Sequence, residues 1–376
     1  MFDSDFGDDT VAPPTASTNL FVRFPASRLL RPAPPIARDE LDGSLAQAEA
    51  AFRALHGARV FLTGGTGFFG AWLLESLGHA IVRLGLDLSV VALTRRPDAA
   101  RLRMPHLANE GWLQYHRGDV RDFVFPEGEF SHVIHAATST HGPSISPQET
   151  LATIADGTTR VLDFCSTRGW PKLLYTSSGA VYGRQPETVS HLAEDFLGAL
   201  DCTDPTQAYG EGKRFAEMRC VVTHPSAVIA RGFAFLGAHL PLDAHFAVGN
   251  FLHDALRRST VVVQSDGTPR RSYLHGTDLA AWLWVMMAFG ANGRAYNLGS
   301  DDDHSLAEVA ERVGMLFQVP VEVRGRGGRG GPRHRYVPNV HRARSELGLQ
   351  VTVNLDEALL RTARWWKTAR GSEGVS

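Results

Sequence analysis

The sequence predicts an α/β fold in which a doubly wound parallel sheet is followed by a smaller C-terminal lobe. Between residues 58 and 240, short apolar runs such as ARVFL and SVVALT alternate with longer runs of helical periodicity. Parallel strands joined by crossover helices produce this alternation, and the helices cover both faces of the sheet. Beyond Leu240 the alternation becomes irregular, and turn sequences such as SDGTP and YNLGSDDD multiply. We therefore place a domain boundary near residue 240, with the second lobe at 241–370.

Two shorter segments precede the sheet. Residues 1–40 mix Asp, Pro, Ser and Thr with little apolar periodicity, which is typical of extended or disordered chain. We interpret them as a flexible tail or surface strap, and we expect deletion of residues 1–38 to leave thermal stability nearly unchanged. In segment 41–57, the sequence SLAQAEAAFRALH has apolar residues at helical spacing and predicts a short amphipathic helix.

Composition and charge exclude several functional classes. The chain is 43% hydrophobic with a formal net charge of -2, so no overall field attracts nucleic acid or an anionic membrane. The longest uncharged apolar stretch, LAAWLWVMMAFG, is shorter than the roughly 20 residues that span a bilayer and predicts a buried helix. The start, MFDSDFGDDT, is acidic where a signal peptide is positively charged. We expect a cytoplasmic protein without a nucleic-acid or membrane partner.

The cysteines and the strand histidines predict no metal site. Cys165, Cys202 and Cys220 are scattered and form neither a CxxC pair nor a Cys/His cluster, so reduced thiols are expected. His132 and His135 lie on an apolar strand. We interpret both as core residues rather than ligands.

A glycine-rich turn follows the first strand. In TGGTGFFG, Gly64, Gly67 and Gly70 stand three apart, between the strand ARVFL and a helix. The first glycine permits the tight turn, the second lets the backbone approach a pyrophosphate, and the third lets helix and strand pack closely. The N-terminus of the helix would face the phosphates. The context predicts a Rossmann-like dinucleotide-binding domain at 58–240.

The end of the second strand bears on the choice of dinucleotide. SVVALT is followed by Arg95 and Arg96, where an NAD enzyme places an acidic residue for the ribose hydroxyls. Arginine attracts a 2'-phosphate through charge-assisted hydrogen bonds. The pair therefore favours NADP over NAD.

The helical segment AYGEGKRFAE carries Tyr209 and Lys213 four residues apart. On a helix this spacing puts both side chains on one face, with their polar ends in reach of a common ligand. Gly210 and Gly212 weaken the helix in the same turn. The spacing alone does not establish a site.

Several motifs, taken in order, resemble one family. They are TGGTGFFG, GDV at 118–120, HAA at 135–137, TSSGAVYG at 176–183, YGEGK at 209–213, and SDGTPRRSYLHGTD, YNLGS and RYVPN in the second lobe. This series resembles the extended short-chain dehydrogenase/reductases, the NAD-dependent epimerase/dehydratase family acting on nucleotide sugars. The resemblance covers about residues 58–365. It implies a nucleotide-sugar-binding lobe at 241–370 and a homodimer built on helices near 151–167 and 207–223.

The resemblance also implies residue roles. Tyr209 would be the acid/base, Lys213 would lower its pKa from about 10 and hold the nicotinamide ribose, and Ser178 would orient the same substrate oxygen. The implied cofactor contacts are Gly64, Thr66, Gly67, Phe68, Phe69, Gly70, Arg95, Arg96, Asp119, Val120, Ala136, Ala137, Ser177, Tyr209, Lys213 and Phe233. The implied contacts to a nucleotide-diphosphate sugar are Ser178, Asn250, Arg271 and Arg335.

Departures from the family pattern narrow the reaction. The family's 4,6-dehydratases place Asp and Glu just after the catalytic Ser or Thr, and its glucuronate decarboxylases keep a Glu; here Gly179 and Ala180 stand there. Neither residue moves a proton, so C4 epimerisation or reduction of a 4-keto-6-deoxy sugar is favoured. A dehydratase, a decarboxylase and a non-catalytic NAD(P)-sensing protein are the alternatives. His141 is a candidate additional acid, although a lone loop histidine is usually solvated.

RGRGGRGGPRHR at 324–335 is the one strongly biased segment within the predicted domains. Such runs bind RNA when disordered. Beside a nearly neutral chain, we interpret this run as a mobile loop that presents arginines to an anionic ligand.

Overall fold

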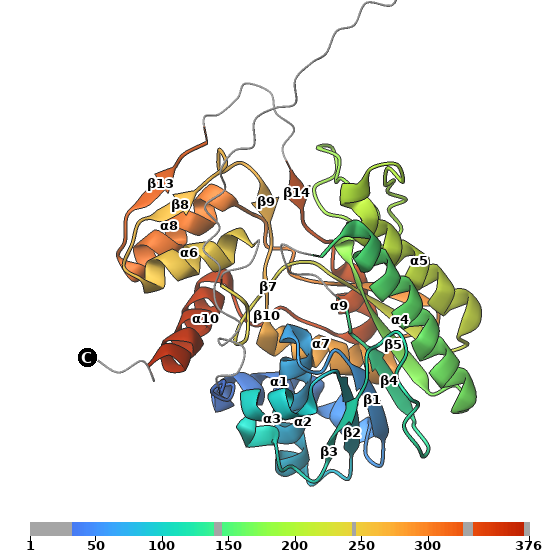
Figure 1. Ribbon diagram of the computed structural model, residues 1–376. Coiled ribbons are helices and arrows are strands. Elements are labelled where there is room, and N and C mark those ends of the chain that lie inside the picture. The colour runs from blue at the N-terminus through green and yellow to red at the C-terminus, as the bar shows by residue number, and fades with distance from the viewer. Residues whose placement is uncertain (1–31, 139–144, 243–245, 326–333, 372–376) are drawn as a thin grey trace, which may run out of the picture.

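A seven-stranded parallel sheet forms the centre of the molecule (Figure 1). The computed structural model describes residues 32–138, 145–242, 246–325 and 334–371. The order of strands is β11-β6-β5-β4-β1-β2-β3. Their bounds are β1 Arg59–Thr63, β2 Ser89–Thr94, β3 Leu113–Arg117, β4 His132–His135, β5 Lys172–Ser178, β6 Ala227–Gly232 and β11 Arg294–Leu298. The strand order reverses between β1 and β4, where such sheets open a crevice for ligands.

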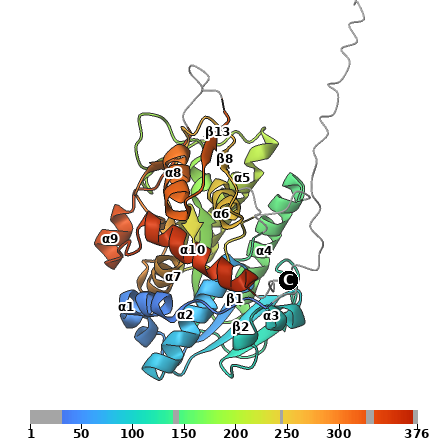
Figure 2. The ribbon, with the colours of Figure 1, turned by 90° about the vertical axis from the view of Figure 1, so that its left-hand side faces the viewer.

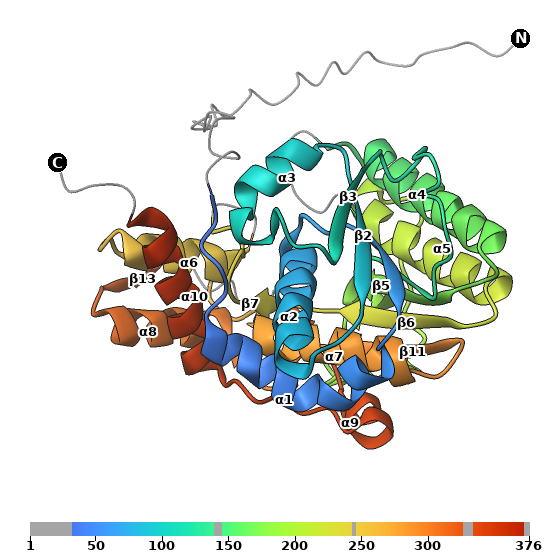
Figure 3. The same cartoon turned by 90° about the horizontal axis from the view of Figure 1, so that it is seen from below.

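Helices cover both faces of this sheet, as the alternating pattern predicted (Figure 3). One face carries α1 Arg38–Ala54, α2 Phe68–Leu84, α3 Pro97–Arg103 and α7 Gly276–Phe289, which share a hydrophobic core with the sheet. The other face carries α4 Pro147–Thr167 and α5 Ala208–Thr223, which enclose a second core around Phe61 and Phe164. The predicted α/β class is confirmed.

The second lobe has its own core and several short strands (Figure 2). Its helices are α6 Ala247–Leu256, α8 Leu306–Phe317 and α10 Leu355–Arg370, while α9 His341–Leu347 packs near β11. β8 Val261–Val263 pairs with β13 Val321–Val323, and β7 Phe235–Leu236 pairs with β10 Leu274–His275. Finally, β12 His304–Ser305, β9 Arg270–Arg271 and β14 Arg335–Tyr336 form a small sheet.

The boundary near residue 240 does not divide the chain cleanly. After entering the second lobe, the chain returns through α7 and β11, and β11 completes the edge of the central sheet beside β6. α7 contains the stretch predicted as a buried helix, and residues 276–287 of it are buried between α1, α2 and the sheet. Among the described residues, no helix is long and apolar enough to cross a membrane. The chain beyond residue 240 thus supplies one strand of the central sheet, and the boundary near residue 240 stays a prediction.

The last residues of the predicted tail pack on the body of the protein. α1 begins at Arg38 rather than near residue 44. Ile36 is only 2% exposed, and its backbone N–H donates to the buried Glu75 carboxylate at 2.7 Å. Trp365 of α10 donates to the Pro34 carbonyl at 3.0 Å. These contacts support a contribution of residues 34–36 to stability, which a single buried side chain does not reveal as a periodic pattern. The expected effect of deleting residues 1–38 stays a prediction.

Candidate functional site

The glycine-rich turn lies at the switch point of the sheet. Gly64 has a φ of +76°, and a Cβ added there would lie 2.6 Å from the carbonyl carbon of Ala136. A Cβ on Gly70 would lie 2.4 Å from the Gly64 carbonyl oxygen. Gly67 is the N-cap of α2, so Thr66, Gly67, Phe68 and Phe69 surround the helix N-terminus. The expected tight turn and close packing are present, and the N–H groups there suit a pyrophosphate.

Ala136 and Ala137 follow β4, and the adjoining His135 is a core residue as predicted. Its Nδ1 lies 2.8 Å from Thr63 Oγ1, and its Nε2 lies 3.2 Å from Thr158 Oγ1. Burial lowers its pKa to about 3, so the ring is neutral. The Ala137 N–H donates to the same Thr63 hydroxyl at 3.1 Å. This network fixes the two strand ends that would flank a dinucleotide.

The predicted adenosine end is rich in cations. Arg95 and Arg96 are both exposed after β2. Burial would raise the pKa of Asp119, but hydrogen bonds from Arg121 and the nearby charge of Arg95 lower it overall. Asp119 therefore lies in an ion pair with Arg121, at 2.9 Å, rather than open to an adenine. The next residue, Val120, is buried against Gly157.

Sequence reasoning missed one cation beside the glycine turn. Arg103, at the end of α3, donates from Nη1 to the Thr66 carbonyl oxygen at 2.9 Å. Burial lowers the pKa of its guanidinium. No local motif marks this residue, because its partner lies 37 positions earlier in the chain.

The structure brings Ser178, Tyr209 and Lys213 together. Ser178 ends β5, and Tyr209 and Lys213 lie in the first turns of α5. The Lys213 Nζ donates to the Thr176 carbonyl oxygen at 2.8 Å and is almost fully buried. α5 approaches closely because Gly210 is small: a Cβ there would lie 2.8 Å from the Ala180 carbonyl oxygen.

Burial changes the acid–base properties of this trio. It lowers the pKa of Lys213 to about 7, against the opposing charge of Glu217. It raises the pKa of Tyr209, and a hydrogen bond with Ser178 partly offsets that rise. The Lys213 ammonium lies 5.9 Å from the centre of the Tyr209 ring. Ser178 is thus the neighbour that favours the Tyr209 anion in this structure, while the expected effect of Lys213 on that pKa stays a prediction.

Ser177 faces away from Ser178, as strand alternation requires. Its hydroxyl donates to the Glu217 carboxylate at 2.5 Å, and Glu217 also binds Arg231 of β6 at 2.7 Å. Its side chain is therefore committed to a buried ion pair beneath the site. Any contact of Ser177 with a cofactor would have to use its backbone.

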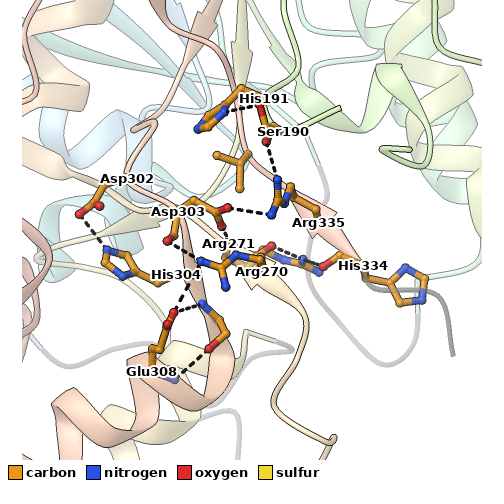
Figure 4. Close-up of polar contacts among 12 residues, drawn as sticks. Ser190, His191, Arg270, Arg271, Asp302, Asp303, His304, Glu308, His334 and Arg335 are labelled. Atoms are coloured by element: carbon orange, nitrogen blue, oxygen red, sulfur yellow. Dashed lines mark hydrogen bonds and ion pairs between the residues drawn. The ribbon is translucent and has the colours of Figure 1, made fainter. Parts of the chain in front are cut away.

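The second lobe contributes arginines from the small sheet (Figure 4). Asp303 lies between two of them, 2.9 Å from Arg270 and 3.3 Å from Arg335. Arg335 also donates to the Ser190 carbonyl oxygen. Arg270 also lies 3.7 Å from Glu308, so two carboxylates balance the two cations. This pairing weakens the predicted role of Arg335 in binding an anion.

Arg271 differs from its neighbours. Within the described residues, its side chain donates hydrogen bonds to the carbonyl oxygens of Arg270 and His334. Burial lowers the pKa of its guanidinium, yet the charge has no acidic partner among these bonds. Its guanidinium lies 5.8 Å from the centre of the Tyr336 ring. Among the three arginines of the small sheet, Arg271 is therefore the one without a carboxylate in its hydrogen bonds.

Tyr336 is a second residue that sequence reasoning missed. Its ring stacks on Phe233, with centroids 4.6 Å apart, and its hydroxyl lies 3.5 Å from Ser178 Oγ. The motif RYVPN was noted, but only Arg335 in it was assigned a role. Asn250 lies exposed on α6, and none of the contacts above reaches it.

A cavity of about 600 Å³ opens beside the catalytic helix. Its wall includes Tyr209, Ala180 and residues of the 199–207 segment.

His141 and residues 326–333 of the Arg/Gly run lie outside the described residues. Across the described ranges, no cluster of His, Cys, Asp or Glu could hold a metal ion. All three cysteines are free thiols.

Comparisons with known proteins agree with this arrangement. UDP-glucuronic acid decarboxylase 1 of Arabidopsis thaliana is 26% identical over 308 residues, which are 81% of this chain and 68% of that protein. The dTDP-glucose 4,6-dehydratase of Streptomyces venezuelae, solved with NAD and TYD bound, has a TM-score of 0.71 at 21% identity over 84% of this chain and 98% of that one. RMD from Pseudomonas aeruginosa, complexed with NADPH, has a TM-score of 0.66 at 22% identity over 83% and 99%.

A family model decides the assignment. The model of the NAD dependent epimerase/dehydratase family matches residues 60–299. This range runs from the first strand through the glycine turn and the catalytic trio to the end of β11. The chain therefore belongs to the NAD-dependent epimerase/dehydratase family of enzymes.

Proposed function

We propose that the protein transfers a hydride at C4 of a nucleotide-linked hexose, as a 4-keto-6-deoxy sugar reductase or a C4 epimerase. The observation that carries this proposal is the placement of Tyr209 beside Ser178 and Lys213, with no carboxylate at Gly179 or Ala180 next to Ser178. In the reductive direction Tyr209 gives a proton to the C4 oxygen, and Ser178 donates a hydrogen bond to that oxygen. A bound nicotinamide supplies the hydride. In an epimerase, Tyr209 would also accept the proton in the reverse half-reaction.

The surroundings of Gly179 and Ala180 argue against elimination of water. A Cβ at position 179 would lie 2.7 Å from both the Tyr336 hydroxyl and the Phe233 ring, so a carboxylate there has no room. Ala180 offers only a methyl group. A second candidate is decarboxylation of a nucleotide-linked uronic acid, favoured by the name of the Arabidopsis relative at 26% identity.

Three arginines support NADP as the cofactor. Arg95 and Arg96 are exposed at the end of β2, and Arg103 contacts the glycine turn. A 2'-phosphate near this edge would form charge-assisted hydrogen bonds with such donors. NAD is the alternative, since structural relatives were solved with either dinucleotide.

Arg271 supports a substrate that contains a nucleotide diphosphate, which this arginine would bind. Its charge lacks an acidic partner in the hydrogen bonds above, whereas Asp303 and Glu308 pair with Arg270 and Arg335. A diphosphate would supply that partner, and the sugar attached to it would extend toward Ser178, past Tyr336.

We also propose that the protein is a homodimer formed through α4 and α5. These helices pack side by side, and α5 exposes Phe215, Met218 and Val222 at helical spacing. A second copy would cover this apolar stripe and form a four-helix contact. Light scattering should give the dimer mass, and Met218→Asp should give the monomer mass.

The test uses purified protein with NADPH and a nucleotide-linked 4-keto-6-deoxyhexose. A reductase oxidises NADPH in proportion to product. Tightly held dinucleotide and equilibration of C4 epimers without net loss of NADPH would identify an epimerase. Formation of a 4-keto-6-deoxy sugar from a plain hexose nucleotide, or release of CO₂ from UDP-glucuronate, would contradict the proposal.

A further inference from the structure

The space beside Ser178 is filled from the other lobe. Gly179 follows Ser178 and is buried. A Cβ at this glycine would meet the Tyr336 hydroxyl and the Phe233 ring, each at 2.7 Å, closer than Cβ atoms approach other heavy atoms. Tyr336 therefore occupies the place that a side chain at position 179 would take.

Tyr336 is held there by contacts on several sides. It lies on β14, in register with Arg271 of β9. Its ring stacks on Phe233 at 4.6 Å between centroids, and its hydroxyl donates to the Gly232 carbonyl oxygen at 3.3 Å. The hydroxyl is thus fixed at the catalytic strand although it comes from the second lobe.

These contacts place Tyr336 in a chain of hydrogen bonds through Ser178. The Ala180 N–H donates to Ser178 Oγ at 3.2 Å. The Tyr336 hydroxyl lies 3.5 Å from Ser178 Oγ, and either oxygen of this pair can be the donor. When Tyr336 donates to Ser178, the Ser178 oxygen accepts from both Tyr336 and the Ala180 N–H, and its own proton is left to point toward Tyr209 or the C4 oxygen of a substrate. A hydrogen bond with Ser178 also lowers the pKa of Tyr209. The Ser178 hydroxyl therefore lies between two tyrosines, and Tyr336 biases the direction in which its proton points.

We propose that Tyr336 is a positioning residue, whose hydroxyl orients Ser178 and whose ring, packed on Phe233 beside Gly179, keeps any acid–base side chain out of position 179. This inference rests on the proposed hydride transfer at C4. It adds a link between lobes, because Arg271, the proposed phosphate ligand, is paired with Tyr336 on the neighbouring strand. A bound diphosphate would therefore fix the strand that carries the orienting hydroxyl.

A double-mutant cycle tests the inference: wild type, Tyr336→Phe, Ser178→Ala and the double variant, assayed for NADPH-linked reduction. Tyr336→Phe keeps the ring stacked on Phe233 and removes only the oxygen. We expect kcat to fall about 10-fold, the effect of losing about 1.4 kcal/mol of transition-state stabilisation, with KM for the sugar nucleotide within about twofold and an unchanged melting temperature. The double variant should be no slower than Ser178→Ala alone.

The inference would be overturned if the kcat losses of the two single variants multiplied in the double variant, or if Tyr336→Phe left kcat unchanged. Either result would leave the proposed function intact. Tyr296→Phe is the matched control, because its hydroxyl contacts Ala291 and Glu346 instead. If the wild type transfers no hydride, the proposed function fails, and ultraviolet titration of tyrosinate then tests the inference without activity. Tyr336→Phe and Ser178→Ala should each shift the Tyr209 ionisation, with no further shift in the double variant; additive shifts, or no shift in Tyr336→Phe, would refute it.

Discussion

The two halves of the candidate site are built in different ways. The first half, Ser178 with Tyr209 and Lys213, lies at the end of a seven-residue central strand and in the first turns of a 16-residue helix. The second half, Arg271 with Tyr336, lies on strands of two residues each. The first half is held rigidly by regular backbone hydrogen bonds and a buried core. The second depends on the pairing of segments that are distant in sequence.

This difference suggests that the first half carries out proton transfer and that the second half binds the substrate. A group that moves a proton must be held in a fixed position, because small displacements are costly for the reaction. A group that binds a diphosphate tolerates more adjustment. We therefore expect substitution of Tyr209 in the first half to lower kcat and substitution of Arg271 in the second half to raise KM for the sugar nucleotide. Tyr336 is the exception in the second half, because its hydroxyl contacts Ser178 and its loss should lower kcat.

Tyr209→Phe should have the largest effect. Loss of the general acid should lower kcat for NADPH-linked reduction by roughly 100-fold or more, with little change in KM. Product formation measured in stopped reactions gives the loss of activity, and a circular-dichroism melting curve shows whether the variant is still folded. A variant that retains most of its activity would break the comparison, because the acid would then come from elsewhere.

Arg271→Ala should have the next largest effect, in the other half. Loss of a charge-assisted contact from a partly buried guanidinium should cost about 2–3 kcal/mol of substrate binding, seen as a raised KM with kcat largely kept. Arg270→Ala is the matched control, since its partner is Asp303, and it should change KM much less. A larger rise in KM for Arg270→Ala than for Arg271→Ala would show that Arg270, and not Arg271, binds the phosphate.

Arg95→Ala sharpens the comparison by testing the cofactor side of the first half. Because Arg95 is exposed, solvent screens it, and we expect a loss near the low end of about 1.5–3 kcal/mol in NADP affinity. NAD affinity should not change. Calorimetric titration with both dinucleotides measures this, and Arg83→Ala at the far end of α2 serves as the control. Equal affinities of the wild type for NAD and NADP would contradict the expected preference for NADP.

Lys213 should make the free energy of unfolding depend on pH, an effect on stability rather than on kcat or binding. Burial lowers its folded pKa from 10.5 to about 7, so between these values the unfolded chain binds more protons than the folded one. The Lys213 contribution to the free energy of unfolding should therefore rise with pH across this window and fall as pH drops toward 7, by at most about 1.4 kcal/mol per unit. Denaturant titrations of wild type and Lys213→Met at pH 7.5 and 9.5 measure this.

The stability difference between the two proteins should shift toward the wild type at the higher pH. Lys367→Met, at an exposed position of α10, should show no such shift. A pH-independent difference for Lys213→Met would mean that the ammonium is better solvated than its burial indicates.

The sequence by itself determined the parts whose causes are local. The glycine turn, the strand and helix alternation and the Tyr209–Lys213 spacing all depend on residues close together in the chain, so each leaves a contiguous pattern. At Gly210 the sequence indicated a weakened helix, and the structure gives the reason for the glycine: a Cβ there would lie 2.8 Å from the Ala180 carbonyl oxygen.

Only the tertiary structure decided the rest. Tyr336 reaches Ser178 across 158 residues, and the backbone of Ile36 reaches Glu75 across 39. β11 returns to the central sheet after the chain has entered the second lobe. Pairing of this kind is set by packing over long chain separations, and residues that meet only in the folded state need no shared local pattern. The sequence resemblance selected Arg271 over Arg270, but it could not distinguish Arg271 from Arg335. The position of Asp303, which contacts Arg335 and not Arg271, separates these two only in the folded chain.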